Sequence, residues 1–289
     1  MLTLASDFGT PYPAAMRAAI RQHSDAEILD VAHDFPRQDV RTAAFWLREV
    51  LPYAPPAVHC AVVDPGVGTD RSAIALRVGE HALVAPDNGL VLPAARELLD
   101  PPAIAGSGLR GVDPVDSPDQ PSDESGDPGA ASTPTEIEAF EILVDDPASS
   151  TFHGRDVFAP AAALIHERGV SEMDACPFLE PRTEYVDLRF PDPVIERGDD
   201  PDDLQIQGQI LVVDGFGNAI TNVPGDVLAE RDRVEVDGTS WPVVDQYAAV
   251  ESGTGLLTVG SHGNVEFAVN RGRGDGVFGV EAGDSISLR

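Results

Sequence analysis

The chain has 289 residues, 42% of them hydrophobic, which is enough for one large domain or for a larger and a smaller one. Its 49 acidic residues outnumber its 19 basic residues, all of which are arginine, and the formal charge is −30. A surface this acidic repels nucleic acid and anionic membranes, excludes both as partners, and indicates a salt-rich cytoplasm of the haloarchaeal type.

Cysteine spacing and the N-terminal sequence narrow the class of protein further. Cys60 and Cys176 are too few for a disulfide framework, and neither has a metal-type spacing, so we expect no metal site. The N-terminus lacks the basic region and long apolar run of a signal peptide, and no segment approaches 18 apolar residues. We therefore expect a cytoplasmic protein.

The first hundred residues alternate between short apolar strands and amphipathic helices. Apolar runs of this kind suit a sheet that is covered on both faces. The pattern predicts an α/β domain with a mostly parallel sheet flanked by helices. The predicted strands are Leu2–Ala5, Glu27–Val31 and Val58–Val63, and the predicted helices are Ala14–Arg21 and Thr42–Leu51.

The rest of the chain divides at two stretches rich in Gly, Pro and Asp. The stretch at about 107–135 reads as an acidic insertion in the first domain, 1–191, and 192–203 reads as a linker. Between them we expect a strand at Ile137–Val144 and a helix at Asp156–Arg168. Residues 204–289 predict a small all-β, barrel-like domain. Its expected strands are Gln205–Val213, Arg233–Val236, Gly255–Val259, Val265–Val269 and Ser285–Leu288.

Three polar motifs follow predicted strands or lead into a helix. They are Asp7-Phe8-Gly9, the loop Asp64–Arg71, and Phe152-His153-Gly154-Arg155-Asp156. Ligands of open α/β sheets bind beyond the carboxyl ends of the strands, so these residues belong to the expected site. Each motif also has a structural interpretation: Asp64-Pro65-Gly66 is a common turn sequence, and His153 is compatible with an ordinary loop histidine.

Taken together, the motifs resemble the SAM hydroxide adenosyltransferases, the hydrolytic relatives of the bacterial fluorinase and chlorinase. The resemblance covers nearly the whole chain except the acidic insertion. The matching stretches are Thr3–Gly9, Val63–Arg71, Ala85–Leu90, Thr151–Pro160, Asp214–Asn218 and Ser261–Asn270.

The resemblance implies that water attacks the ribose C5′ of S-adenosyl-L-methionine (SAM) and releases adenosine and methionine. A sulfonium leaves as a neutral thioether, so we expect no cofactor. Asp64, Arg71 and His153 would hold the attacking water. The division of roles among the three stays open.

Further residues would bind the substrate. By resemblance, Asp7 would accept hydrogen bonds from the ribose hydroxyls, Asp214 would pair with the methionine amino group, and Ser261 would bind the same end. Asn218 would read an adenine edge, and aromatic side chains would form the walls. The full expected binding set is Asp7, Asn88, Phe152, Gly154, Asp214, Phe216, Asn218, Tyr247 and Ser261. The stretch Asp214–Asn218 is also compatible with a bulged turn, and Phe216 with ordinary core.

The resemblance further implies a homotrimer with its site at the subunit interface. Two other functions stay open. One is a SAM- or adenosine-binding sensor without turnover, although a binder needs no water triad. The other is a SAM-dependent 5′-halogenase, but the halogenases carry Tyr where Asp64 stands, and a carboxylate repels a halide ion. We therefore expect hydrolysis.

Overall fold

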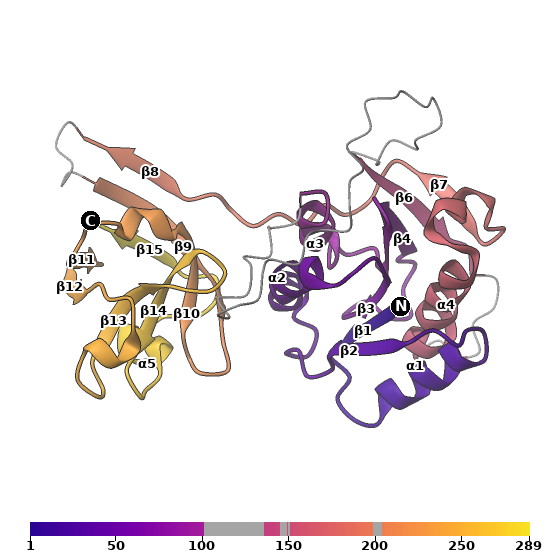
Figure 1. The fold of residues 1–289 in the computed structure, drawn as a ribbon, viewed down its shortest axis with the longest axis horizontal. Helices are drawn as coiled ribbons and strands as arrows, with labels where there is room; N and C mark the ends of the chain where they lie inside the picture. The colour runs from indigo at the N-terminus through magenta and orange to yellow at the C-terminus, as the bar shows by residue number, and fades with distance from the viewer. Residues whose placement is uncertain (101–135, 145–148, 150, 199–203) are drawn as a thin grey trace, which may run out of the picture. The chain divides into compact units, whose positions relative to one another are not determined.

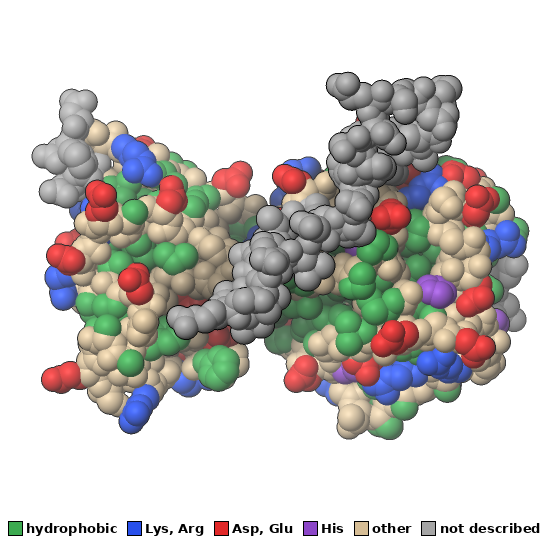
Figure 2. Space-filling view, in the orientation of Figure 1, with side chains coloured by type: hydrophobic (Ala, Val, Ile, Leu, Met, Phe, Trp, Pro, Cys, Tyr) green, Lys and Arg blue, Asp and Glu red, His purple; other side chains and the backbone are tan. Residues whose placement is uncertain are grey.

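A computed structural model describes residues 1–100, 136–144, 149, 151–198 and 204–289. The chain divides into two compact units, Met1–Leu188 and Arg189–Arg289 (Figure 1). The expected acidic insertion at about 107–135 lies outside the described residues. Carboxylates are scattered over the face of each unit that Figure 2 shows.

Unit 1 is built on a seven-stranded sheet with the order β2-β1-β3-β5-β4-β6-β7. Strands β1, β2, β3 and β5 are parallel, whereas β4, β6 and β7 pair antiparallel. The strands are β1 (Leu2–Ser6), β2 (Ile28–Ala32), β3 (Val58–Val62), β4 (Ala73–Val78), β5 (His81–Pro86), β6 (Ile137–Ile142) and β7 (Leu179–Arg182).

The expectation of a mostly parallel sheet therefore needs correction, because only one half of the sheet is parallel. The reason lies between β4 and β5, where only Gly79 and Glu80 separate the two strands. Two residues are too few for the crossover that parallel neighbours require, so the strands form a hairpin. Gly79 has a φ of +56°, which suits the turn of such a hairpin.

Helices cover both faces of this sheet, as predicted. Helices α1 and α4 pack against each other on one side, and α2 and α3 pack against each other on the opposite side (Figure 1). The α1–α4 layer closes the core over alternate residues of β1 and β3. The helical segments are α1 (Tyr12–Arg21), α2 (Val40–Val50), η1 (Leu51–Tyr53), α3 (Leu92–Glu97), η2 (Gly154–Phe158), α4 (Ala159–Arg168) and η3 (Val170–Ala175).

A histidine pair lies inside this unit, on the strands of the sheet. His59 is 1% exposed and sits opposite Thr3 in the β1–β3 register. Its Nδ1 lies 2.9 Å from the Thr3 hydroxyl, and its Nε2 lies 3.0 Å from Nδ1 of His81. The two imidazole rings stack. Each ring nitrogen of His59 is thereby hydrogen-bonded without water.

Unit 2 is an antiparallel sheet with the order β12-β11-β15-β9-β10-β14-β13, and β8 pairs with β9. The strands are β8 (Val194–Arg197), β9 (Leu204–Val213), β10 (Ala219–Pro224), β11 (Arg233–Val236), β12 (Thr239–Pro242), β13 (Gly255–Val259), β14 (Asn264–Val269) and β15 (Ser285–Leu288). The unit also has the short helix α5 (Gly274–Phe278) and the single turns η4 (Gly225–Leu228) and η5 (Tyr247–Ala249).

The expected β domain is thus present with one short helix added. The stretch 192–203, expected as a linker, contains β8, which belongs to the sheet of unit 2. Among the described residues, no helix is long and apolar enough to cross a membrane.

Candidate active site

Two carboxylates stand at the carboxyl ends of adjacent parallel strands in unit 1. Asp7 directly follows β1, and Asp64 stands two residues after the end of β3, while the register pairs Ser6 with Val62. Both side chains therefore lie at one edge of the sheet, where α/β proteins bind ligands. Asp7 is 8% exposed, and its Oδ2 accepts the backbone N–H of Gln38 at 2.7 Å.

Asp64 forms both the turn and the ion pair that its loop permits. Its Oδ1 accepts the backbone N–H of Gly66 at 3.0 Å and also pairs with Nη2 of Arg71. A side chain at Gly66 would place its Cβ only 3.2 Å from Nε of Arg71, so glycine lets the guanidinium fold back over the turn. The structural interpretation of Asp64-Pro65-Gly66 as a turn is therefore correct, and it is only half of the arrangement.

The other half of this ion pair has no hydrogen-bond partner in the part of the chain that the structure describes. The atoms without a partner are Oδ2 of Asp64 and Nη1 of Arg71, and both are buried. The side chains are only 5% and 18% exposed, respectively. A buried polar atom without a partner costs roughly 1–3 kcal/mol, so an acceptor and a donor left in this state favour a polar ligand.

His153 begins the helical segment that packs against the same strands. It stands directly before η2, a π-helical stretch that contacts β3 and α1. Gly154 permits this approach, since a Cβ there would lie 2.8 Å from the ring of Phe8. Phe8 directly follows Asp7, so the backbone next to His153 packs against the residue that follows this aspartate. Helical stretches of the π type are rare and are frequent at functional sites.

Aromatic rings line the chain beside His153. Phe152 packs edge-to-face on Phe8, with ring centroids 5.7 Å apart, and on Tyr12, with centroids 5.4 Å apart. Tyr12 is 52% exposed, so the cluster reaches the surface. Phe152 thus has the environment of an apolar wall at the strand ends.

Asn88 lies at the same edge, after β5, and its side chain is engaged within the chain. Its amide NH₂ donates to the carbonyl of Val63 at 2.9 Å, and its Oδ1 accepts the N–H of Leu90 at 3.1 Å. Because Val63 directly precedes Asp64, this amide ties the end of β5 to the residue before the ion pair. Sequence reasoning placed Asn88 at the site without this contact.

His33 belongs to the same edge and was missed from the sequence. Its Nδ1 lies 2.8 Å from the Ser6 hydroxyl, its Nε2 lies 2.9 Å from Asp30, and its carbonyl accepts the N–H of Gly9 at 2.7 Å. The residues on both sides of Asp7 are thereby fixed by one histidine. The available signal was its place two residues after the predicted strand Glu27–Val31, near a strand end like Asp7 and Asp64.

In unit 2, the turn between β9 and β10 is closed by its own aspartate. Oδ1 of Asp214 accepts the N–H groups of Phe216 and Asn218, each at 2.8 Å, and Oδ2 accepts the Asn218 amide at 3.0 Å. This is the turn that the structural interpretation anticipated. Phe216 is 82% exposed, which contradicts its interpretation as ordinary core and leaves its ring open to a ligand.

Tyr247 and Ser261 lie elsewhere on unit 2. Strand β10 pairs Ala219 with Phe267, so the Asp214 turn lies beside the carboxyl half of β14, whereas Ser261 precedes its amino end. Tyr247, in η5, donates its hydroxyl to Glu266 of β14 at 2.7 Å. The expected residues of unit 2 are therefore spread along one strand, with Tyr247 bound to its middle.

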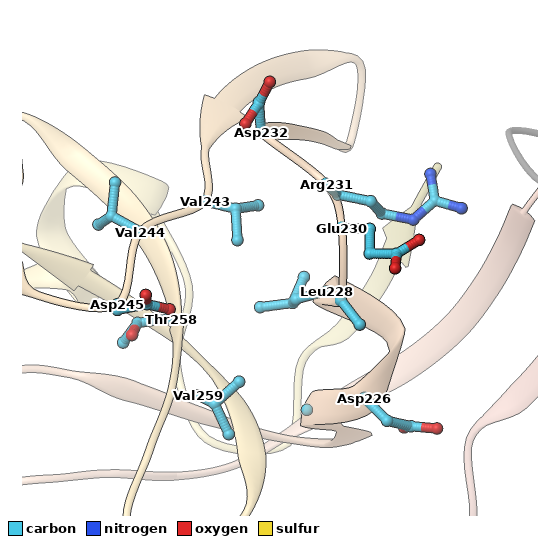
Figure 3. Close-up of a pocket in the computed structure, with 12 residues that line it drawn as sticks. Asp226, Leu228, Glu230, Arg231, Asp232, Val243, Val244, Asp245, Thr258 and Val259 are labelled. Carbon is cyan, nitrogen blue, oxygen red and sulfur yellow. The ribbon is translucent and has the colours of Figure 1, made fainter.

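Unit 2 also has a surface pocket of about 590 Å³ that contains none of the expected site residues (Figure 3). Leu228, Val243 and Val259 point into it, while Glu230 and Arg231 point outward. Among the described residues, no group of three or more His, Cys, Asp or Glu side chains is arranged to hold a metal ion.

Comparison with known proteins identifies the family of the chain. Residues 2–106 match the N-terminal domain of the SAM hydroxide adenosyltransferases, and residues 208–287 match their C-terminal domain. The chain belongs to this family. Two proteins named (R)-S-adenosyl-L-methionine hydrolase, from Salinispora tropica and Thermus thermophilus, are 35% and 37% identical over 99% and 98% of this chain and 97% of their own.

A solved structure has a similar fold. An uncharacterized conserved protein from Thermotoga maritima superposes with a TM-score of 0.74 at 29% identity, covering 100% of this chain and 99% of its own. Both family domains thus fall on the two units, with Asp7, Asp64 and Arg71 in the first match and Asp214, Tyr247 and Ser261 in the second.

Proposed function

We propose that the chain hydrolyses (R)-S-adenosyl-L-methionine to adenosine and L-methionine. The observation that carries the proposal is the Asp64–Arg71 pair, with one buried acceptor and one buried donor left for a ligand. A water molecule matches both, since it donates to Oδ2 and accepts from Nη1. The relatives named (R)-S-adenosyl-L-methionine hydrolase supply the substrate and the configuration at its sulfur.

The reaction is a substitution at the ribose C5′. The water oxygen forms a bond to C5′, the C5′–S bond breaks, and its electron pair goes to sulfur, so that methionine leaves as a neutral thioether. The water loses a proton, for which the carboxylate of Asp64 is the acceptor. Arg71 stabilises the developing hydroxide character, and His153 anchors the water.

Positioning supplies most of the catalysis in this scheme. Water is a weak nucleophile, and holding it in line with the C5′–S bond makes its attack effectively unimolecular. Asp7 binds the ribose hydroxyls, and Phe152 shields the reacting carbon from bulk solvent. Asp214 and Ser261 hold the methionine end, Asn218 contacts an adenine edge, and Phe216 and Tyr247 form walls of the adenosine part. Asn88 and Gly154 shape the strand edge behind the triad.

We further propose that the chain acts without a cofactor, as a homotrimer whose sites combine unit 1 of one subunit with unit 2 of the next. A neutral leaving group needs neither a proton nor a Lewis acid. The formal charge of −30 fits work in a salt-rich cytoplasm, where counterions screen the self-repulsion.

The test is an assay of purified protein in concentrated KCl with each sulfonium epimer of SAM, followed by chromatography. We expect adenosine and methionine in equal amounts, formed faster from the (R) epimer and unaffected by EDTA. Tight binding without products would identify a sensor. Substantial 5′-chloroadenosine would identify a halogenase and contradict the argument from the charge of Asp64.

A further inference from the structure

A buried carboxylate in unit 2 has no role in the proposed reaction. Glu266 is 5% exposed and lies on β14, opposite Ile220 of β10 and Thr258 of β13. A buried carboxylate is costly unless its oxygens are hydrogen-bonded or paired. The partners of the two oxygens therefore indicate what this side chain does.

The first oxygen holds Tyr247. The phenol donates to Oε1 at 2.7 Å, although Tyr247 itself is 43% exposed and sits in the short turn η5. Burial raises the pKa of the Tyr247 phenol, and the nearby charges of Glu266 and Asp214 raise it further. The phenol therefore keeps its proton and remains the donor.

The second oxygen faces the turn between β13 and β14. Oε2 lies 3.5 Å from Nε2 of His262. Nδ1 of the same ring accepts the N–H of Asn264 at 3.2 Å, which places the ring proton on Nε2 in the neutral state, toward Glu266. The imidazole thus joins the turn to the carboxylate.

Gly260 makes room for this arrangement. A Cβ at residue 260 would lie 2.7 Å from Oε2 of Glu266 and would collide with the ring of His262. The backbone of Gly260 is also fixed, since its N–H donates to the carbonyl of Asn264 at 3.0 Å. Ser261 follows directly, so its position depends on the same packing.

We propose that Glu266 is a positioning residue for the substrate, because one carboxylate fixes both Tyr247 and the turn that carries Ser261. The inference rests on the proposed function, in which Tyr247 lines the adenosine part and Ser261 binds the methionine end. Glu266 itself touches neither part. It couples the two binding segments across β14.

The test compares Glu266→Gln with two single-partner variants, using SAM hydrolysis and calorimetric binding of adenosine. Glutamine keeps an acceptor oxygen for the Tyr247 phenol but removes the negative charge that faces both Tyr247 and His262. We expect the KM of Glu266→Gln for SAM to rise about tenfold, with kcat within about twofold, and its adenosine affinity to fall. Tyr247→Phe should lose adenosine affinity, whereas His262→Ala should raise KM for SAM and leave adenosine affinity unchanged.

Glu235→Gln, on the exposed face of β11, is the matched control and should match wild type. In the double variant Tyr247→Phe/Glu266→Gln, the loss of adenosine affinity should be smaller than the sum of the two single losses, because both changes act on the same Tyr247–Glu266 hydrogen bond. Wild-type KM and adenosine affinity in Glu266→Gln would overturn the proposal, as would additive losses. If wild type bound adenosine but did not hydrolyse SAM, the proposed function would fail, while the adenosine measurements would still decide the role of Glu266.

Discussion

In the proposed reaction, Asp64 serves the fold with one carboxylate oxygen and the chemistry with the other. Oδ1 accepts from Gly66 and pairs with Arg71, which fixes the loop after β3. Oδ2 is left for a ligand. Because hydrogen bonds to Oδ1 fix the carboxylate group, the direction of Oδ2 is fixed as well. A group that activates water needs this preorganisation.

Asp64→Asn separates these two roles. Asparagine keeps an oxygen for the turn but removes the charge and the proton acceptor. We expect kcat for SAM hydrolysis to fall by about 10²–10⁴ with KM changed by less than about threefold, since the loss is confined to the transition state. Steady-state kinetics measure both. Asp70→Asn, an exposed aspartate in the same loop, is the control, and a kcat near wild type in Asp64→Asn would contradict the triad.

At this scale the sequence predicts positions better than contacts. The strand-end rule places Asp7 and Asp64 at one edge, and the structure agrees. The contact from Asn88 to the carbonyl of Val63 was not predictable, because it depends on which strand lies next to β3. His33 also stands near the end of a predicted strand, but its contact with Ser6 was not predictable, because Ser6 lies on a neighbouring strand.

Among the elements, the long periodic segments were predicted well and the hairpins were not. Helices α1 and α2 and strands β1, β3 and β13 lie within one or two residues of their expected ranges. The sequence pattern did not show β4 and β5, since apolar runs broken only by Gly79 and Glu80 resemble one long segment. Without this turn the antiparallel half of the sheet could not be predicted, because the length of a connection decides whether its two strands are parallel or antiparallel.

The strand pair β3–β5 carries a prediction about pH. Burial, with a smaller contribution from the charge of His81, holds the pKa of His59 at about 3, against 6.5 in the unfolded chain. The unfolded state therefore binds the proton first, so stability is fully present above pH 6.5 and is lost as the pH falls toward 3. We expect a loss of about 2 kcal/mol at pH 5 from this residue.

Chemical denaturation between pH 7.5 and 5 measures this loss. His59→Gln removes the titrating group and should flatten the acid limb, although it lowers stability at neutral pH. His23→Gln changes an exposed histidine and should leave the limb as in wild type. An equally steep limb in His59→Gln would assign the acid sensitivity to other groups.

For the whole molecule, the proposed shared site predicts complementation. Asp64→Asn damages unit 1 and Asp214→Ala damages unit 2, so each variant alone should be nearly inactive. Co-expressed in equal amounts, they form mixed trimers in which one of the three sites, about one third, combines two intact halves. We expect about a third of wild-type activity per trimer, measured on assemblies purified through a different tag on each variant. No activity above the separate variants would place each site within one subunit.

The π-helical stretch Gly154–Phe158 fixes the angular setting of His153. An α-helix turns by about 100° per residue. Deleting one residue of this stretch would therefore rotate the imidazole by about 100° around the helix axis. The alanine-rich face of α4 would still pack on the sheet. The direction of this side chain is consequently encoded by the number of residues between it and the core, and an insertion or deletion there would misdirect it without unfolding the unit.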